Sequence, residues 1–464
     1  MKKRIIRTRQ IKLSGDTMTP ISCFLNLRDV YASLALFESS EYSSKANSKS
    51  FICVEPISTF SANEEKTTLR EGKNVAIDPI KKLSVSIEEY QSSFDFENHD
   101  TIDNNGFFGL VGYDAIPHFE TVKFKQRKHF KDLPIVCFSV YRYVIVFDNF
   151  TNQIDVLVNT FEGETVNVDQ FLSQLSQHKN YQNNFHKTGT YSSNETELSF
   201  MEKVVTAKEH VKKGDVFQVV ISRAFQQDFQ GDEFEVYRKL RGLNPSPYMF
   251  YFELDKGKLF GASPEAQIRI NNGQVEIHPI AGTVKRSGDL EVDKIRAEEL
   301  KNDIKENAEH TMLVDLARND LNITCRDVKV DAYKEIQSFS HVIHMVSKVT
   351  GELNNEQSIE AFAKSFPAGT LSGAPKYRAM EIIADLEENN RGYYGGAIGH
   401  ISPNGDVNMA IIIRSCLSYQ GQLHYQAGAG IVMDSIPENE LQEVYNKIGA
   451  VQKAIDLASH STSV

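Results

Sequence analysis

The chain has 464 residues, of which 41% are hydrophobic and 24% charged, an ordinary balance for a folded protein of one large or two smaller domains. Its formal net charge of −11 argues against nucleic acid as the main partner. No stretch approaches the roughly 18 apolar residues of a membrane span, and the basic start is not followed by the apolar core of a signal peptide. Five scattered cysteines without C-x-x-C spacing predict a reducing, cytoplasmic compartment with no disulfides or zinc site.

Residues 1–180 form the first predicted domain, an N-terminal unit of strands and turns. Within it, residues 141–147 have the composition of a strand. Residues 181–196 are rich in Asn, Ser and Thr and show little periodicity, which predicts a linker. The second predicted domain covers residues 197–460.

The second domain begins with a helix, because Phe200, Val204, Ala207 and Val211 fall at helical spacing and Gly214 supplies a stop. Several strands follow, predicted at 216–225, 248–254, 266–270, 275–280, 397–401 and 407–415. Further helices are predicted at 298–318, at 376–388 and from about Pro437. Meandering strands mixed with helices predict an α+β fold and not a doubly wound parallel sheet.

Two of these helices each carry a pair of glutamates three residues apart, Glu306 with Glu309 and Glu440 with Glu443. The spacing puts both carboxylates of a pair on one helix face, overlapping or beside the apolar stripe. Carboxylates directed at a core must be neutralised, and two such helices facing each other suit a hard divalent cation such as Mg²⁺. The alternative is a pair of solvated helix faces, since Glu is seldom buried.

Three short glycine-containing segments, at 279–283, 369–376 and 428–430, are suited to close approach of the backbone to a ligand. The alternative is that they are ordinary turns, which glycine and proline also mark. With the hydroxyls of Thr283 and Thr370 they could donate hydrogen bonds to carboxylates.

Two single residues each allow a structural and a functional interpretation. Arg414 ends an apolar strand, so it is either paired in the core or a bidentate carboxylate clamp. His344 is either a core histidine or a general acid or base, because its ordinary pKa lies near neutrality. No glycine-rich dinucleotide or Walker motif is present, so neither a dinucleotide nor ATP is expected.

Residues 200–455 resemble the catalytic domain of the chorismate-utilising enzymes. The matching segments occur in order at 214–220, 261–265, 279–283, 308–321, 369–380, 394–397, 413–415 and 428–430, followed by the last acidic helix. The resemblance implies an α+β fold of two packed antiparallel β-sheets, with helices on the outside and a cleft between subdomains.

Within this family the chain resembles the large, synthase components of anthranilate synthases. Gln218 stands where members that use water carry a lysine that activates it, which fits ammonia as the nucleophile. Ala281 stands where 4-amino-4-deoxychorismate synthases typically place a lysine that attacks the substrate, so direct addition of ammonia is implied.

The N-terminal region shares this resemblance at 15–21, 36–40 and 44–50. Together with 244–250 it implies a feedback site for tryptophan in which the candidate residues are Glu38, Ser39, Lys49, Pro245, Tyr248 and Met249. For Tyr248 and Met249 the alternative is a place in a strand core.

The reaction implied by the resemblance is that of chorismate with ammonia to give anthranilate, pyruvate and water, the first committed step of tryptophan biosynthesis. Glu265 would protonate the departing C4 hydroxyl, for which its pKa must be raised. His344 would assist the elimination of pyruvate. Gln218 and Thr370 complete the implied catalytic set.

The implied cofactor is Mg²⁺, bound directly by Glu309 and Glu443 and through water by Glu306 and Glu440, where it would hold the ring carboxylate. The other implied residues hold the substrate or offset the charge of the four glutamates. They are Tyr394, Arg414 and the amides of Gly428, Ala429 and Gly430 for the enolpyruvyl carboxylate, Gly282, Thr283 and Thr370 for the ring end, and Lys447 beside the acids.

No cysteine lies in a Gly-x-Cys-x-Gly setting, so the chain lacks an amidotransferase signature and a separate glutaminase subunit is expected to supply ammonia. Neither a nucleic acid nor a membrane is expected as a partner. The alternatives are a 2-amino-2-deoxyisochorismate synthase, a 4-amino-4-deoxychorismate synthase component, or a catalytically inactive regulator that binds tryptophan.

Overall fold

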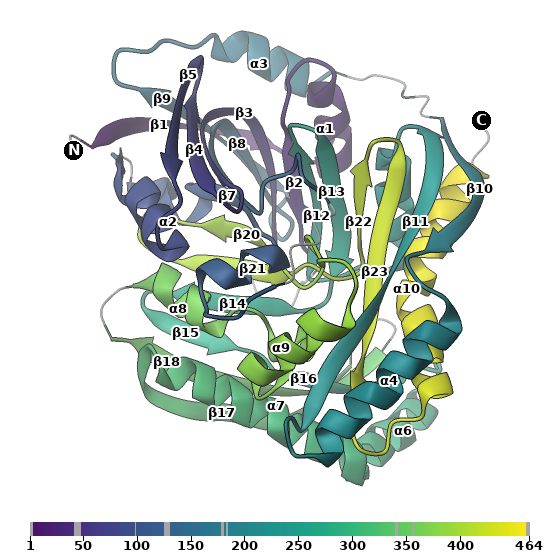
Figure 1. The fold of residues 1–464 in the computed structure, drawn as a ribbon. Coiled ribbons are helices and arrows are strands. Elements are labelled where there is room, and N and C mark those ends of the chain that lie inside the picture. The colour runs from purple at the N-terminus through teal and green to yellow at the C-terminus, as the bar shows by residue number, and fades with distance from the viewer. Residues whose placement is uncertain are drawn as a thin grey trace.

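The computed structural model describes residues 3–40, 48–97, 99–124, 130–177, 181, 184–338, 342–354 and 357–460. Its strands form two large sheets with helices on their outer sides, which confirms the predicted α+β class (Figure 1). Of the pairings between described strands, that of β1 with β6 is parallel and the others are antiparallel. Among the described residues no helix has the length and apolarity needed to cross a membrane.

Two long strands, β3 (Lys49–Ala62) and β8 (Val136–Asp148), pair along their whole length and belong to both sheets. A register shift between Pro56 and Ser58 separates the two halves of the pair, and Glu55 adopts a left-handed backbone angle, φ 61°. A bulge of this kind bends a strand pair and increases its twist. It allows one half of the pair to continue into each sheet.

The first sheet extends from this pair through strands of both chain halves. Its order is β6 (Phe94–Phe96), β1 (Arg4–Ser14), β9 (Gln153–Phe161), β8, β3, β2 (Ala35–Glu38), β12 (Tyr248–Leu254), β13 (Gly257–Ser263), β22 (Ser415–Tyr419), β23 (Gln422–Ile431), β11 (Gln218–Gly231) and β10 (Phe185–Ser193). The short β19 (Gly373–Ala374) pairs with the start of β11.

The second sheet extends from the other half of the β3–β8 pair. Its order is β5 (Asn74–Pro79), β4 (Lys66–Glu71), β3, β8, β7 (Phe107–Val111), β20 (Ala397–Ile401), β21 (Val407–Ile411), β14 (Ala266–Asn271), β15 (Gln274–Ile277), β18 (Val342–Leu353) and β17 (Cys325–Ser338). The strand β16 (Ile280–Lys285) pairs with the other part of β18.

The core has three main layers. A cluster that includes Phe108, Tyr141 and Phe250 lies between the two sheets. A second cluster lies between the first sheet and the helices α1 (Pro20–Arg28), α3 (Val168–Leu175), α4 (Glu197–Lys212), α5 (Phe234–Leu243), α9 (Lys376–Leu386) and α10 (Pro437–Ser459). A third lies between the second sheet and the helices α2 (Leu83–Ser92), α7 (Ile304–Asn322) and α8 (Ser358–Ser365). The helix α6 (Leu290–Asn302) covers β16 and β18.

The predicted linker at 181–196 contains a strand, so this prediction was wrong. Residues Phe185–Ser193 form β10, which pairs with β11 at the edge of the first sheet. Phe185 is buried, whereas most of the other side chains of β10 are exposed. An edge strand with few buried side chains has a polar composition, and the sequence alone does not distinguish it from a linker.

Candidate active site

Two neighbouring crossings between the sheets place Glu265 and Arg414 close to each other. The chain passes from β13 to β14 at Glu265 and from β21 to β22 at Arg414. The two segments are joined by hydrogen bonds from the Ile411 N–H to the Glu265 carbonyl and from the Ala262 N–H to the Arg414 carbonyl, at 3.0 and 3.2 Å. Arg414 has a φ of 50°, a strained conformation for a residue with a side chain.

The Glu265 carboxyl has the properties of a proton donor at neutral pH. Burial raises its pKa to about 7, while Thr370, Arg414 and Lys447 act in the opposite direction. The Thr370 hydroxyl donates a hydrogen bond to Oε1 of Glu265 at 3.0 Å. A carboxyl with a pKa near the working pH is protonated often enough to act as an acid and is still acidic enough to release the proton.

The first acidic pair, Glu306 and Glu309, lies in α7. One continuous helix was predicted at 298–318, but the structure has two. That segment is divided between α6 and α7 at Asp303. The Asp303 side chain accepts a hydrogen bond from the Glu306 N–H at 2.9 Å and thereby caps a new helix. The prediction of one continuous helix was therefore wrong, although both glutamates are helical as expected.

The two acidic pairs act on one another across the gap between α7 and α10. Burial raises the pKa values of Glu306, Glu309 and Glu440, and the Glu443 charge raises all three further. Lys447 lies 2.6 Å from a Glu443 oxygen and donates a hydrogen bond to the Gly428 carbonyl at 2.8 Å. The cleft therefore holds more negative charge than its lysines balance locally.

This donor set fits a hard divalent cation, although it is not a complete cage. Within the described residues, no group of three or more His, Cys, Asp or Glu side chains is arranged to hold a metal ion. Mg²⁺ commonly takes one or two carboxylates and keeps several waters. The mutual repulsion of the four glutamates provides a reason for such an ion to bind between the two helices.

His344 lies on β18 opposite β16. Its Nδ1 is 3.2 Å from the carbonyl oxygen of Gly282, and since a carbonyl only accepts, Nδ1 carries the proton. Burial lowers the pKa of His344, and the Arg414 charge lowers it further against the effect of the Gly282 carbonyl. The imidazole is therefore neutral near pH 7 with an unprotonated Nε2 that can accept a proton.

Gly282 allows β16 to approach the acidic helix. It has a φ of 70°, and a Cβ at this position would lie 2.6 Å from Leu300 and 3.1 Å from a Glu306 carboxylate oxygen. A larger residue would therefore be strained and would push against Glu306. The backbone of Thr283 pairs with that of His344, while its side chain lies outside the described part of the structure.

Gln218 and the glycines of β23 lie on the opposite side of the site. Val220 pairs with Gly430 and Ser222 with Gly428. A Cβ on Gly430 would lie 2.2 Å from Nε2 of Gln218, so the amide rests directly on the glycine backbone. Oε1 of Gln218 is buried and has no hydrogen-bond partner among the described residues. A buried acceptor without a partner is unusual, and a ligand that donates a hydrogen bond would satisfy it.

Residues 35–453 match the family described as chorismate binding enzyme. The chain belongs to this family. It is 37% identical over 482 residues to anthranilate synthase component 1 from Aquifex aeolicus (strain VF5), an alignment that covers 97% of this chain and 94% of that protein. As a member of this family with relatives of this kind, it is a chorismate-converting lyase.

Solved structures agree with this assignment. Anthranilate synthase component I from Streptococcus pneumoniae superposes with a TM-score of 0.77 at 31% identity, covering 95% of this chain and 98% of that one. The menaquinone-specific isochorismate synthase from Escherichia coli has the same fold, with a TM-score of 0.76 at 18% identity and coverage of 98% and 95%. The predicted fold of two sheets with outer helices is thus that of the chorismate-binding enzymes.

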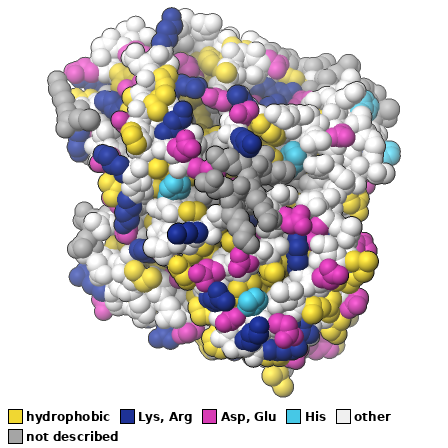
Figure 2. Space-filling model, viewed as in Figure 1, with side chains coloured by type: hydrophobic (Ala, Val, Ile, Leu, Met, Phe, Trp, Pro, Cys, Tyr) yellow, Lys and Arg dark blue, Asp and Glu magenta, His cyan; other side chains and the backbone are white. Residues whose placement is uncertain are grey.

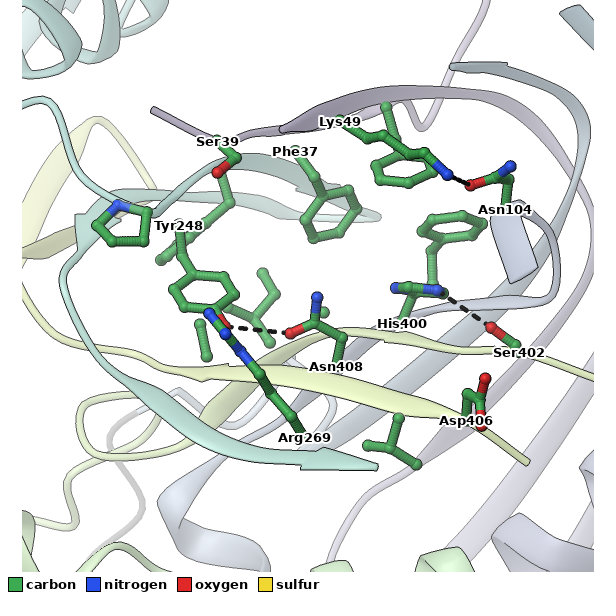
Figure 3. A pocket seen from close by; sticks show the side chains of 18 of the residues that line it. Phe37, Ser39, Lys49, Asn104, Tyr248, Arg269, His400, Ser402, Asp406 and Asn408 are labelled. Atoms are coloured by element: carbon green, nitrogen blue, oxygen red, sulfur yellow. Dashed lines mark hydrogen bonds between the residues drawn. The ribbon is translucent and has the colours of Figure 1, made fainter. Parts of the chain in front are cut away.

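A cavity of this chorismate-binding enzyme, of about 340 Å³, lies between the two sheets (Figure 3). Of the six predicted inhibitor-site residues, five line it: Glu38, Ser39, Lys49, Tyr248 and Met249. Pro245 is exposed and does not line it, whereas Pro247 does. The cavity is a separate space from the Glu265 site, since Glu265 is not among its lining residues.

Polar residues that the sequence had not indicated face this cavity. Arg269 donates a hydrogen bond to the Tyr248 hydroxyl at 2.6 Å, and this hydroxyl donates to Asn408 at 3.2 Å. In Figure 3 these three side chains gather on one side of the cavity and Lys49 and Asn104, joined at 2.8 Å, lie on another. Asn408 is the one polar position in β21, a signal that could have indicated it from the sequence, whereas Arg269 alternates with other polar residues along β14 and gives no such signal.

Glu38 is already neutralised by residues of α5. Its carboxylate accepts hydrogen bonds from the Tyr237 hydroxyl at 2.6 Å and from Nε of Arg241 at 2.9 Å. It therefore closes the cavity wall and does not offer a free negative charge to a ligand. On the face shown in Figure 2 the basic and acidic side chains of the described residues are interspersed.

Proposed function

We propose that this chorismate-binding enzyme is the synthase component of an anthranilate synthase. It would convert chorismate and ammonia to anthranilate, pyruvate and water in the presence of Mg²⁺. The observation that carries the proposal is the neutral amide of Gln218, which lies against Gly430 and whose buried Oε1 has no hydrogen-bond partner among the described residues. The relatives named anthranilate synthase component 1 support it.

Ammonia would add directly at C2 of the ring. An amide such as that of Gln218 cannot remove a proton from water, but its oxygen can accept a hydrogen bond from ammonia. Ala281, on β16, offers no amine that could attack in its place. These two neutral side chains favour an external nitrogen nucleophile over water or a covalent lysine intermediate.

Glu265 would protonate the C4 hydroxyl as it departs. The proton is available because burial holds the pKa of this carboxyl near 7, and the Thr370 hydroxyl orients it. After transfer, the carboxylate is stabilised by Thr370 and by the charges of Arg414 and Lys447. Bond formation at C2 and departure of water from C4 would thus be coupled through the ring.

Mg²⁺ would be held by Glu309 and Glu443, with Glu306 and Glu440 linked through water, and would supply positive charge for the ring carboxylate. The chain itself prepares this place by crowding four carboxylates whose repulsion the ion relieves. Gly282 lets β16 lie against Glu306, which sets the ring end of the substrate beside the acids.

In the second half of the reaction the ring loses the C2 proton and the enolpyruvyl group leaves as pyruvate. His344 is the base we assign to this step, because its Nδ1 proton is bound to Gly282 and its Nε2 can accept. Arg414, Tyr394 and the backbone at 428–430 would hold the enolpyruvyl carboxylate. Thr283 and Thr370 would contact the ring end.

Two further elements of the proposal concern supply and control. A separate glutamine amidotransferase subunit would deliver ammonia, which is scarce at neutral pH because most of it is ammonium. Tryptophan would inhibit by binding the cavity lined by Lys49, Tyr248 and Met249, whose mixed polar and aromatic walls suit an amino acid with a large ring.

The test is an assay of the purified chain with chorismate, ammonium and Mg²⁺, following anthranilate fluorescence and pyruvate together. We expect equal amounts of both products, dependence on Mg²⁺, and inhibition by tryptophan. Accumulation of an unaromatised amine without pyruvate would identify a 2-amino-2-deoxyisochorismate synthase instead. A 4-amino product would identify a 4-amino-4-deoxychorismate synthase component.

A further inference from the structure

A buried ion pair that the reaction does not use lies directly behind the active site. Arg391, in the loop between α9 and β20, donates from Nε and Nη2 to both carboxylate oxygens of Glu387 at 2.8 and 2.6 Å. The two side chains are only 1% and 7% exposed. Pairs buried to this extent often contribute little to stability because desolvation offsets their attraction, so a role in specifying geometry is the better explanation.

The same guanidinium holds two backbone segments that carry site residues. Its Nη1 donates to the Leu371 carbonyl at 2.6 Å and its Nη2 to the Val220 carbonyl at 2.8 Å. Leu371 follows Thr370, the donor to Glu265, and Val220 lies two residues beyond Gln218 on β11. Both segments are therefore tied to one rigid, planar group.

The rest of the pair's surroundings restrict its movement. Oε1 of Glu387 accepts hydrogen bonds from the N–H and the hydroxyl of Ser222 at 2.8 and 2.6 Å. The Arg391 guanidinium carbon lies 4.7 Å from the centroid of the Tyr113 ring and 5.6 Å from that of Tyr394. Arg391 therefore packs against both Tyr113, from the N-terminal region, and Tyr394, a predicted substrate contact.

The segment that Arg391 holds has little regular secondary structure of its own. Residues Gly369–Leu371 form a single short 3₁₀ turn, and poor hydrogen-bond geometry makes such turns less stable than α-helix. The turn has a bond from the Leu371 N–H to the Ala368 carbonyl, and Ser372 accepts from the Val220 N–H. The Arg391 bond to the Leu371 carbonyl is a second tie between this turn and the core behind it, beside the Val220 bond to Ser372.

We propose that Arg391, held by Glu387, is a positioning residue that aims the Thr370 hydroxyl at Glu265 and sets Gln218 against the glycines of β23. It touches none of the reacting atoms. The inference rests on the proposed function, because Glu265 must be the proton donor for the alignment to limit the rate.

Arg391→Lys keeps a positive charge but cannot bridge Glu387, Leu371 and Val220 at once. We expect kcat to fall by roughly 10-fold to 100-fold, the range expected when a catalytic group is misplaced by about 1 Å. The KM for chorismate should change far less, because the carboxylate contacts of the substrate remain.

The pH profile supplies a readout that simple destabilisation would not move. The groups acting on the Glu265 carboxyl are Thr370, Arg414 and Lys447, and all three lower its pKa. If Thr370 turns away, the carboxyl keeps its proton to a higher pH. The alkaline limb of the kcat profile should therefore shift upward in Arg391→Lys and, to a similar extent, in Thr370→Val.

A double-mutant cycle with Thr370→Val tests the route directly. If Arg391 acts through Thr370, the double variant should be about as slow as the slower single variant, since groups acting through one contact are not additive. Glu387→Gln, which keeps the shape of the partner, should lower kcat in the same direction and serves as a second variant if Arg391→Lys folds poorly.

Arg142→Lys is the matched control. Arg142, on β8, is also buried and donates to both oxygens of Glu164 at 2.7 Å and to the Asn159 carbonyl on β9 at 2.9 Å. Arg142→Lys should lower the midpoint temperature of thermal unfolding and leave kcat and its pH profile unchanged.

The inference is overturned if Arg391→Lys and Glu387→Gln behave like this control, or if their effects on kcat multiply with that of Thr370→Val. Failure of the wild-type chain to make anthranilate would instead overturn the proposed function. The cycle would then be measured on whichever product the wild type forms from chorismate, and the same non-additivity would be required.

Discussion

Replacing Glu265 with glutamine should separate two consequences of burying this carboxyl. The variant has no proton to donate, so kcat for anthranilate formation should fall by roughly 100-fold or more, given that general acid catalysis contributes about 10²–10⁴. At alkaline pH the same variant should be more stable than the wild type, because an amide of equal shape carries no charge that must be desolvated.

The magnitude follows from the pKa of the carboxyl, which is raised from 4.5 to about 7. The unfolded chain releases the proton near the lower value and the folded chain near the higher one. Wild-type stability is therefore lost as pH rises through this window. At about 1.36 kcal/mol per pKa unit, the penalty is about 1 kcal/mol at pH 5 and about 3.5 kcal/mol at pH 8.

The stability of both proteins can be measured by urea unfolding at pH 5 and pH 8. Circular dichroism is the suitable signal because the chain has no tryptophan. The advantage of Glu265→Gln over the wild type should grow by about 2.5 kcal/mol between these pH values. Glu276→Gln is the control: His278 and Lys348 hold the pKa of Glu276 at about 2, so its charge stabilises the fold. This variant should be less stable than the wild type by an amount that stays nearly constant between pH 5 and pH 8. A stability difference between Glu265→Gln and the wild type that stays constant from pH 5 to pH 8 would refute the reasoning.

Three other substitutions test separate parts of the site. Glu309→Gln should raise the Mg²⁺ concentration needed for half-maximal activity by roughly 10-fold or more, since one direct ligand is lost; an unchanged Mg²⁺ titration of anthranilate formation would contradict this assignment. Gln218→Lys should slow anthranilate formation from ammonium by roughly 10-fold, because it buries an ammonium group against Gly430; product analysis that shows an unchanged yield would count against it. Lys49→Ala should weaken inhibition by tryptophan by roughly 10-fold with kcat unchanged, as one charged donor leaves the cavity; equal inhibition of both proteins would exclude Lys49 from the binding site.

Sequence periodicity was sufficient for the acidic helices. The apolar stripe of α10 is buried at Leu441, Val444 and Ile448, and the adjoining glutamates act on those of α7. The expectation that Glu265 has a raised pKa is also met. In each case a short-range rule applies: spacing along a helix decides which residues share a face, and a carboxyl enclosed by protein resists ionisation.

Features that depend on partners far along the chain were not predictable in this way. Arg269 and Arg391 are single charged residues, and their roles become visible only when the fold brings Tyr248 beside Arg269 and the Leu371 and Val220 carbonyls beside Arg391. The division between α6 and α7 depends on one capping side chain, Asp303, within a stretch whose composition is helical throughout.

The pairing of β2 with β12 and of β7 with β20 has a consequence for synthesis of the chain. Glu38 pairs with Met249 and Gly109 with Gly399. These N-terminal strands can therefore pair fully only after the second half of the chain has been synthesised. Pairings of such long sequence separation fold slowly, because chain entropy is lost before the contacts are gained. Until then β2 and β7 present open edges, to which a neighbouring nascent chain could add a strand.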